Sequence, residues 1–252
     1  MKAYNFTTIK IEFLETIDYD IVHDRHYKYH ENDFLYKRNP ENKVLTVCFH
    51  GWAPKGSYPI FRGYDYNLKG SDTLSIADKL QHELNINVTF YLNYIEDYIQ
   101  IISTIFKAGN YSKILFFGTS GGGFISLYLA SYFNQYAFIA NAFIYSNNYH
   151  YLRLKKRCKN TQYSIRMHIQ SVLDQYGFPK KVYLFSNKAD SIHVKNSKLF
   201  LQENEKHKEN INETFFNKRP NDGSDPHNFN MPSKNAEKWI QHFINKINAN
   251  NY

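Results

Sequence analysis

Short apolar runs and longer stretches with helical spacing alternate along most of the chain. Short runs rich in β-branched and aromatic residues predict strands, whereas apolar residues that recur every three or four positions predict helices. The predicted strands lie near residues 8–14, 34–37, 43–49, 87–92, 114–117, 137–143, 181–185 and 211–216. The predicted helices lie near residues 73–83, 95–108, 122–132, 161–176 and 233–247.

The order of these elements predicts the fold class. The first strands alternate apolar and polar residues, as in an antiparallel edge hairpin, and the later strands alternate with helices, as in a parallel sheet. We find no internal repeat, low-complexity stretch or linker, so residues 1–252 are expected to form a single α/β domain with a mostly parallel central sheet. In the last helix, Ser233 is a predicted N-cap, and Trp239, Ile240, Phe243 and Ile247 form a predicted buried stripe.

A glycine-rich turn joins the strand at 114–117 to the helix at 122–132. Its sequence, Gly118-Thr119-Ser120-Gly121-Gly122, fits the G-x-S-x-G nucleophile elbow, in which a serine is lifted off a parallel sheet. The alternative is an ordinary glycine-rich turn between a strand and a helix. Nucleotide binding is not expected: a P-loop needs Lys-Ser/Thr where Phe124 follows Gly123, and a dinucleotide fingerprint would need Gly or Ala where Ser126 stands.

Two further residues complete the order of a serine triad along the chain. Asp190 follows the strand at 181–185, and His227 stands in a turn-rich loop after the last predicted strand. Such a triad works because the imidazole of His227 removes the proton of Ser120 during attack, while the carboxylate orients the imidazole. Each residue has another reading. Asp190 fits the N-cap of a helix at 192–201, His227 fits a surface loop, and Asp222 or Asp225 could replace Asp190.

An oxyanion hole needs two backbone N–H groups near the serine. The residue after the nucleophile, Gly121, supplies one candidate, and the loop after the strand at 43–49 supplies the other, from Gly51 or Trp52. We assign His50 to holding this loop at the substrate rather than to catalysis.

The chain is basic, with a formal net charge of +8 and a sequence pI near 9.2. Much of the excess falls between Arg153 and Arg166, within residues 150–178, which are placed where a lid would cover the nucleophile. Tyr149, Arg153 and Lys156 are therefore candidate contacts to an anionic substrate. A solvated basic surface is the alternative. Nucleic acid is not an expected partner, because no binding motif accompanies the charge.

Other features bear on location and metal binding. The N-terminus lacks the apolar core of a signal peptide, no stretch approaches membrane-spanning length, and the two cysteines form no disulfide framework, so a cytoplasmic protein is expected. Cys48 is placed in a buried strand, and neither it nor Cys158 is a predicted nucleophile. His23, His26 and His30 would share one face of a helix, but no ligand partner has a suitable spacing, so no metal site is predicted.

Together, the serine elbow, the His50-Gly51 loop and the order of Asp190 and His227 resemble the α/β-hydrolase superfamily. The runs FHGWAPKGSYPIFRGYDY (49–66), GTSGGGF and NKADSIHV (187–194) look more narrowly like small bacterial α/β-hydrolase-like proteins from capsule and surface-polysaccharide gene clusters. In that group an aspartate-histidine pair follows the seventh strand, which Asp190 and His193 match loosely. Trp52 departs from a full HGGG motif.

The resemblance implies acyl transfer to a polysaccharide, since some capsule-cluster proteins of this fold are O-acetyltransferases. Acetyl-CoA would then be the acyl donor rather than a bound cofactor, and capsule assembly enzymes would be partners. Two alternatives remain open at this stage. One is an esterase with the same triad, acting on a carbohydrate or a small molecule, and the other is a non-catalytic, hydrolase-like scaffold in capsule assembly.

Overall fold

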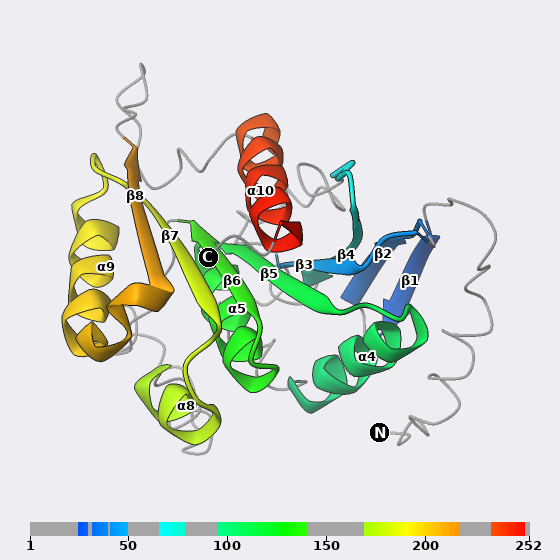
Figure 1. Ribbon diagram of the computed structural model, residues 1–252, viewed down its shortest axis with the longest axis horizontal. Coiled ribbons are helices and arrows are strands. Elements are labelled where there is room, and N and C mark those ends of the chain that lie inside the picture. The colour runs from blue at the N-terminus through cyan, green and yellow to red at the C-terminus, as the bar shows by residue number, and fades with distance from the viewer. Residues whose placement is uncertain are drawn as a thin grey trace.

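A computed structural model of the protein describes residues 25–29, 32–39, 41–49, 66–78, 95–140, 169–216 and 233–249. Eight strands of this part form one sheet (Figure 1). The strands are β1 (Arg25–Tyr29), β2 (Asn32–Lys37), β3 (Val44–Phe49), β4 (Ser71–Asp78), β5 (Lys113–Thr119), β6 (Tyr136–Ala140), β7 (Lys181–Asn187) and β8 (Ile211–Phe216). The helices are α4 (Ile95–Ala108), α5 (Gly121–Tyr132), α8 (Ile169–Tyr176), α9 (Ser191–Glu203), the 3₁₀ helix η1 (Glu205–Asn210) and α10 (Ser233–Asn248).

The sheet is mostly parallel, as the sequence predicts. Its strand order is β1-β2-β4-β3-β5-β6-β7-β8. β2 pairs antiparallel with β1 and with β4, whereas every neighbouring pair from β4 across to β8 is parallel. The carboxyl ends of β3 to β8 therefore meet at one edge of the sheet, and chemical groups in the loops after these strands gather there.

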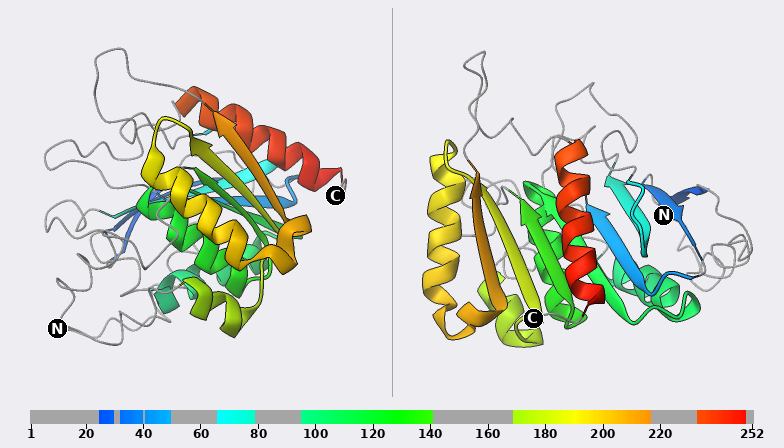
Figure 2. Two further views of the ribbon diagram at one scale, coloured as in Figure 1. Left: turned by 90° about the vertical axis from the view of Figure 1, so that its left-hand side faces the viewer. Right: turned by 45° about the horizontal axis from the view of Figure 1, so that its top comes forward.

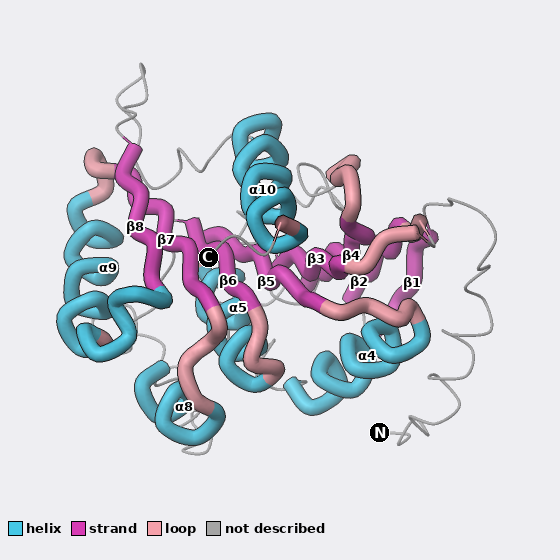
Figure 3. The backbone as a smooth tube through the Cα atoms, in the orientation of Figure 1, coloured by secondary structure: helices cyan, strands magenta, loops and turns pink. Residues whose placement is uncertain are grey.

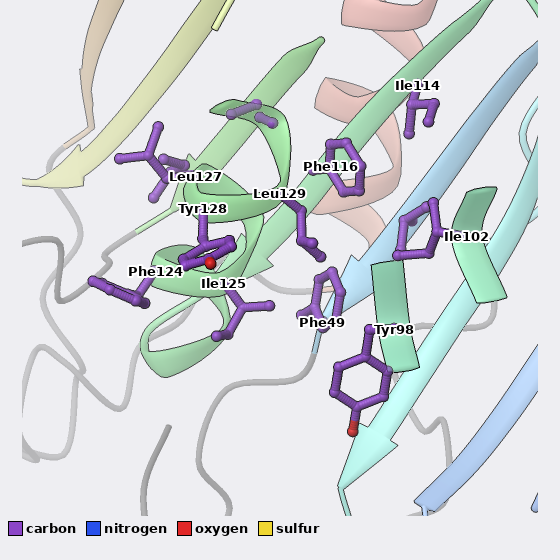
Figure 4. Close-up of a cluster of buried hydrophobic side chains, with 14 of the residues drawn as sticks. Phe49, Tyr98, Ile102, Ile114, Phe116, Phe124, Ile125, Leu127, Tyr128 and Leu129 are labelled. Atoms are coloured by element: carbon purple, nitrogen blue, oxygen red, sulfur yellow. The ribbon is translucent and has the colours of Figure 1, made fainter. Parts of the chain in front are cut away.

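Two apolar cores hold helices on both faces of the sheet. One core packs α4, α5, α8 and α9 against one face, and Figure 4 shows its centre, where Phe49 and Phe116 meet Tyr98 and Leu129. The other core packs α10 against the opposite face through residues such as Ile240 and Phe243. The strands of the middle are fully buried because both of their faces are covered, which explains their continuous apolar runs. Figure 2 shows these layers from two further directions.

Helix α10 also fixes the direction in which the chain returns after β8. The carbonyl of Ile247, in its last turn, accepts a hydrogen bond from Nζ of Lys113, the first residue of β5. The C-terminal end of α10 therefore lies at the amino edge of the sheet. A helix of 16 residues spans about 24 Å, so Ser233 begins it toward the carboxyl edge.

Two predicted elements differ from the structure. The helix predicted near 73–83 is wrong over its described part, which is strand β4. Its alternate residues Leu74 and Ile76 are buried in one core, while Ser71 bonds Thr46 of β3 through their hydroxyls at 2.7 Å. Pairing with a strand on each side, β2 and β3, outweighs a weak helical spacing. The antiparallel partner of β2 is β1, and the strand predicted at 8–14 lies outside the described residues, as does that at 87–92.

Smaller differences concern single residues. His26 lies in strand β1, so a shared helix face with His23 and His30 is wrong. Trp239 was predicted to be buried in α10 but is 37% exposed, because it covers the rim of the core with its ring 4.6 Å from that of Phe185. Ile240, Phe243 and Ile247 are buried as predicted.

The connections between elements are short in the described part of the chain, as the tube drawing in Figure 3 shows. The helix predicted at 161–176 is described only as α8, whose buried residues Ile169, Val172 and Leu173 pack in the core beside α5. The remainder of the predicted lid, residues 150–168, lies outside the described residues. None of the helices in the described ranges combines the length and the apolar character needed to cross a bilayer.

Candidate active site

Ser120 stands at the sharp turn between β5 and α5 with a strained backbone. Its φ of 50° and ψ of −122° lie where side-chain-bearing residues are rarely found. The turn closes tightly: a Cβ on Gly118 would lie 2.2 Å from the carbonyl oxygen of Gly122. Only glycine fits at 118, so the spacing of G-x-S-x-G has a steric cause. A strained serine between a parallel strand and a helix is the geometry that a nucleophile elbow requires.

The backbone around Ser120 is held by the strand beside it and by the helix that follows. Its N–H donates to the carbonyl of Ala140 at the end of β6, at 3.1 Å, and its carbonyl accepts from Gly123 in α5, also at 3.1 Å. Its side chain makes no capping hydrogen bond to α5. The side chain is 4% exposed. The serine is thus fixed in place while its hydroxyl is not used for helix capping.

Gly121 begins helix α5, as an oxyanion donor requires. The first N–H groups of a helix have no partner within that helix, and the helix dipole favours negative charge at this end. The apolar α5, with Leu127 and Leu129 fully buried, keeps this end rigid against the sheet. The N–H of Gly121 therefore remains the predicted first donor of the oxyanion hole.

Asp190 follows β7 and holds the start of α9. Its Oδ1 accepts the backbone N–H of His193 at 3.2 Å, and its Oδ2 lies 2.5 Å from Nδ1 of the same histidine. Both side chains are buried, at 6% and 2% exposure. The helix-capping reading of Asp190 is therefore correct. It leaves the catalytic reading open, because a carboxylate accepts more hydrogen bonds than these two.

The register of the sheet brings the loops of Ser120 and Asp190 to one edge. Thr119 pairs with Ala140, and Ala140 pairs with Phe185, so β5 and β6 end at one level and β7 continues two residues beyond it, to Asn187. Strands of a sheet lie about 4.8 Å apart, which places Thr119 and Phe185, two strands apart, about 10 Å from each other. Ser120 and Asp190 each follow their strand at this same edge.

Strand β8 ends at Phe216 on this same edge of the sheet. Residues 217–232, which include His227, connect the carboxyl end of β8 to Ser233, and they lie outside the described residues. So do several other predicted site residues, which therefore stay predictions: His50, Gly51, Trp52, Tyr149, Arg153, Lys156 and the alternative acids Asp222 and Asp225.

Residue-by-residue reasoning missed His193, to which it gave no role of its own. Its signal in the sequence is the spacing Asp-x-x-His at the start of a helix, where residue N3 faces the cap. Nδ1 of His193 lies 2.5 Å from Oδ2 of Asp190, and both side chains are buried, so each limits the movement of the other. His193 therefore fixes the carboxylate that we assign to the triad.

The described ranges support neither a cysteine nucleophile nor a metal ion as another catalytic group. Cys48 is fully buried in β3, and burial raises the pKa of its thiol far above the usual range, so it is no nucleophile. Within the part of the chain that the structure describes, no cluster of three or more His, Cys, Asp or Glu could hold a metal ion.

Comparison with known proteins gives a fold but no close relative. No protein-family model and no curated protein matches the sequence. Among solved structures, esterase 2 of the planctomycete Thermogutta terrifontis in its propionate-bound form superposes with a TM-score of 0.62 at 14% identity, covering 91% of this chain and 96% of that one. Its form phosphonylated by sarin superposes with a TM-score of 0.63 at 14% identity, over 89% and 95% of the two chains.

A capsule O-acetyltransferase of Neisseria meningitidis serogroup A is also similar. It superposes with a TM-score of 0.57 at 17% identity, covering 90% of this chain and 96% of that chain. These likenesses extend over nearly the whole length of each protein, and they agree with the mostly parallel sheet flanked by helices. The protein has the α/β-hydrolase fold.

Proposed function

We propose that the protein is a serine acyl enzyme with Ser120 as nucleophile, His227 as general base and Asp190 as the carboxylate that orients His227. The observation that carries this proposal is the backbone of Ser120: a strained residue, clamped by Gly118 and Gly122, at the end of a central parallel strand. Strain of this kind persists where the surrounding structure enforces it, and in this fold the position is that of the nucleophile.

The chemistry follows in two steps. Oγ of Ser120 attacks the acyl carbon while His227 takes the hydroxyl proton, and the N–H groups of Gly121 and of Gly51 or Trp52 stabilise the oxyanion. Collapse of this intermediate expels the alcohol or thiol of the donor, which receives the proton from His227. In the second step His227 deprotonates an acceptor hydroxyl, which attacks the acyl-serine; the bond to Oγ of Ser120 breaks, His227 returns the proton to Oγ, and the acyl group leaves on the acceptor.

The identity of the acceptor decides between two activities. We favour a carbohydrate hydroxyl, with acetyl-CoA as donor, which makes the protein a polysaccharide O-acetyltransferase. The likeness to a capsule O-acetyltransferase supports this choice, together with the motifs shared with proteins of capsule gene clusters. If water is the acceptor, the same site is an esterase, and the likeness to an esterase with bound propionate favours that candidate.

The two activities are separated by weighing the products. The protein is incubated with acetyl-CoA and a capsule-type oligosaccharide, and the sugar is analysed by mass spectrometry. A transferase adds about 42 mass units per acetyl group to the sugar, whereas an esterase releases only free acetate. Ser120→Ala should abolish either product. Acetylation that persists in this variant would contradict the proposal.

A non-catalytic role in capsule assembly is the remaining alternative. It predicts that the wild-type protein and Ser120→Ala behave alike in every assay of acyl transfer. The proposal predicts instead that they differ by about three orders of magnitude or more, the usual effect of losing a serine nucleophile.

A further inference from the structure

A groove of about 510 Å³ follows helix α9 at the end of the molecule where β8 closes the sheet. Figures 1 and 2 show α9 and β8 side by side in each view. The groove is lined by Lys188, Ser191, Val194, Lys195, Lys198, Leu199 and Gln202. The polar side chains among these recur at helical spacing, so they form one stripe along the helix.

The groove is positively charged. Lys188, Lys195 and Lys198 are exposed, and the only carboxylate between residues 188 and 202 is the buried Asp190. In the described part of the chain no ion pair holds these ammonium groups. Lys188 lies over the ring of Phe215, with Nζ 5.7 Å from its centre. The three cations are therefore available to an anionic ligand.

One carboxyl group lies behind the groove. Glu213 of β8 pairs in register with Leu184 and so faces the same side of the sheet as α9. Lys198 is its charged neighbour. This carboxyl is half-buried and competes weakly with a ligand for Lys198.

The groove begins at the loop that holds Asp190. Lys188 directly follows β7 at the carboxyl edge of the sheet. Its N–H donates a hydrogen bond to the carbonyl of Phe216 at 2.8 Å. Helix α9 then carries the lining residues away from that edge over about 17 Å, the length of eleven helical residues. A chain molecule that reached Ser120 could continue along this groove, whereas a small ester would be too short.

We propose that the groove binds the anionic units of a polymeric glycan, with carboxylate or phosphodiester groups, whose acyl-accepting unit lies at Ser120. This inference rests on the proposed function and gives its substrate class. The three lysines match the repeated charges, and the hydroxyl, amide and aliphatic groups of Ser191, Gln202 and Val194 suit sugar hydroxyls and C–H faces.

Other occupants fit the groove less well. No aromatic ring is among the residues that line it in the described structure, so nucleic acid bases would lack a stacking surface. Side chains of a helix offer no backbone groups for strand addition, which an extended peptide uses. A second copy of this chain, with a net charge of +8, would be repelled.

Binding is best measured in the Ser120→Ala protein, where no turnover occurs. Fluorescent oligogalacturonate and poly(glycerol phosphate) are the two anionic probes, and dextran of equal length is the neutral probe. We expect at least one anionic probe to bind and dextran not to bind at about 50 mM salt. The triple variant Lys188→Gln/Lys195→Gln/Lys198→Gln should weaken binding about tenfold, as expected for three exposed charge contacts.

A matched control removes three exposed lysines near the amino ends of the strands, as Lys43→Gln/Lys69→Gln/Lys107→Gln. It should change affinity less than twofold, and Glu213→Gln should tighten binding. Equal losses in both triple variants, or no binding of either anionic probe, would overturn the proposal. So would polyglutamate or oligo-dT that binds as tightly through the same lysines.

The outcome is separable from that of the enzyme mechanism. If Ser120 proves unreactive while the anionic probe still binds through the three lysines, the catalytic proposal fails and the glycan groove stands. If Ser120 is reactive but probe binding does not depend on the three lysines, the groove proposal is refuted and the catalytic proposal stands.

Discussion

Ser120 combines a common side chain with an uncommon backbone. Its φ of 50° is enforced by the close contact of Gly118 with Gly122 and by the hydrogen bond from its N–H to Ala140. A free serine hydroxyl is a poor nucleophile, so Ser120 can act as a nucleophile only with a base nearby. The proposed mechanism therefore depends on the residues that orient the base, His227. In the described part of the chain these are Asp190 and, through its contact with Asp190, His193.

His193 should act as a positioning residue through Asp190. His193→Leu removes the imidazole whose Nδ1 lies 2.5 Å from Oδ2 of Asp190, and we expect kcat/KM to fall about tenfold, as for the loss of one polar contact to a charged group. The freed carboxylate would hold the catalytic imidazolium more strongly, so the acid limb of the pH–rate profile should move to higher pH.

His193→Asn is the matched variant, because its amide N–H stands close to the place of Nδ1. It should restore most of the rate and the wild-type pH profile. A His193→Leu protein that loses stability but keeps the wild-type pH profile would assign His193 to the helix cap alone.

At the scale of elements, the sequence predicted the strands and helices of the middle and the C-terminal half closely. The helix predicted at 95–108 is α4, whose apolar residues have clear helical spacing, and the strand predicted at 211–216 is β8 with the same bounds. The prediction was wrong at β4. This segment is a strand because it lies between β2 and β3, and that position depends on tertiary structure. The tight turn between β5 and α5 was predictable because the glycine at 118 has a local steric cause.

Gly118→Ala tests this steric cause at the junction of β5 and α5. The added Cβ would lie 2.2 Å from the carbonyl oxygen of Gly122, so we expect a loss of about 3 kcal/mol or more in the free energy of unfolding. Gly177→Ala is the control, since its Cβ would meet no atom within 4 Å and only its φ of 89° is strained. It should cost about 1 kcal/mol. Urea unfolding compares the two, and equal losses would refute the account of the turn.

At the scale of the whole molecule, the two ends of the strands carry different groups of polar residues. The carboxyl edge carries Ser120 and Asp190. Toward the opposite edge lies a buried polar cluster in which Asp72 of β4 accepts hydrogen bonds from Tyr111, from Asn42 at 2.8 Å and from the N–H of Asn39 at 2.7 Å. The sequence predicted that the sheet is mostly parallel, but it did not predict the strand order or the register. Both depend on contacts between residues that are far apart in the sequence.

This cluster makes stability depend on pH. Burial raises the pKa of the Asp72 carboxyl, although its hydrogen bonds, the first from Tyr111, oppose the change. The folded protein then holds this proton more tightly than the unfolded chain does. The stabilisation is complete below the ordinary aspartate pKa of about 3.9 and is lost as the pH rises through the raised value.

Asp72→Asn removes the titration while keeping an acceptor and a donor in place. We expect the stability of the wild type relative to this variant to fall as the pH rises from about 4 to about 7. Tyr36→Phe, which removes only the hydroxyl 2.6 Å from that of Tyr111, should keep the wild-type pH dependence. Urea unfolding over this range measures both. A relative stability that rises with pH would show that the hydrogen bonds outweigh burial.

The central claim is that Ser120 is an activated nucleophile. It is tested most directly by labelling the protein with a fluorophosphonate probe and mapping the modified peptide by mass spectrometry. We predict one adduct per chain, on Ser120, with slower labelling in Asp190→Asn and none in Ser120→Ala. A folded wild-type protein that stays unlabelled, or that labels equally after Ser120→Ala, would contradict the account.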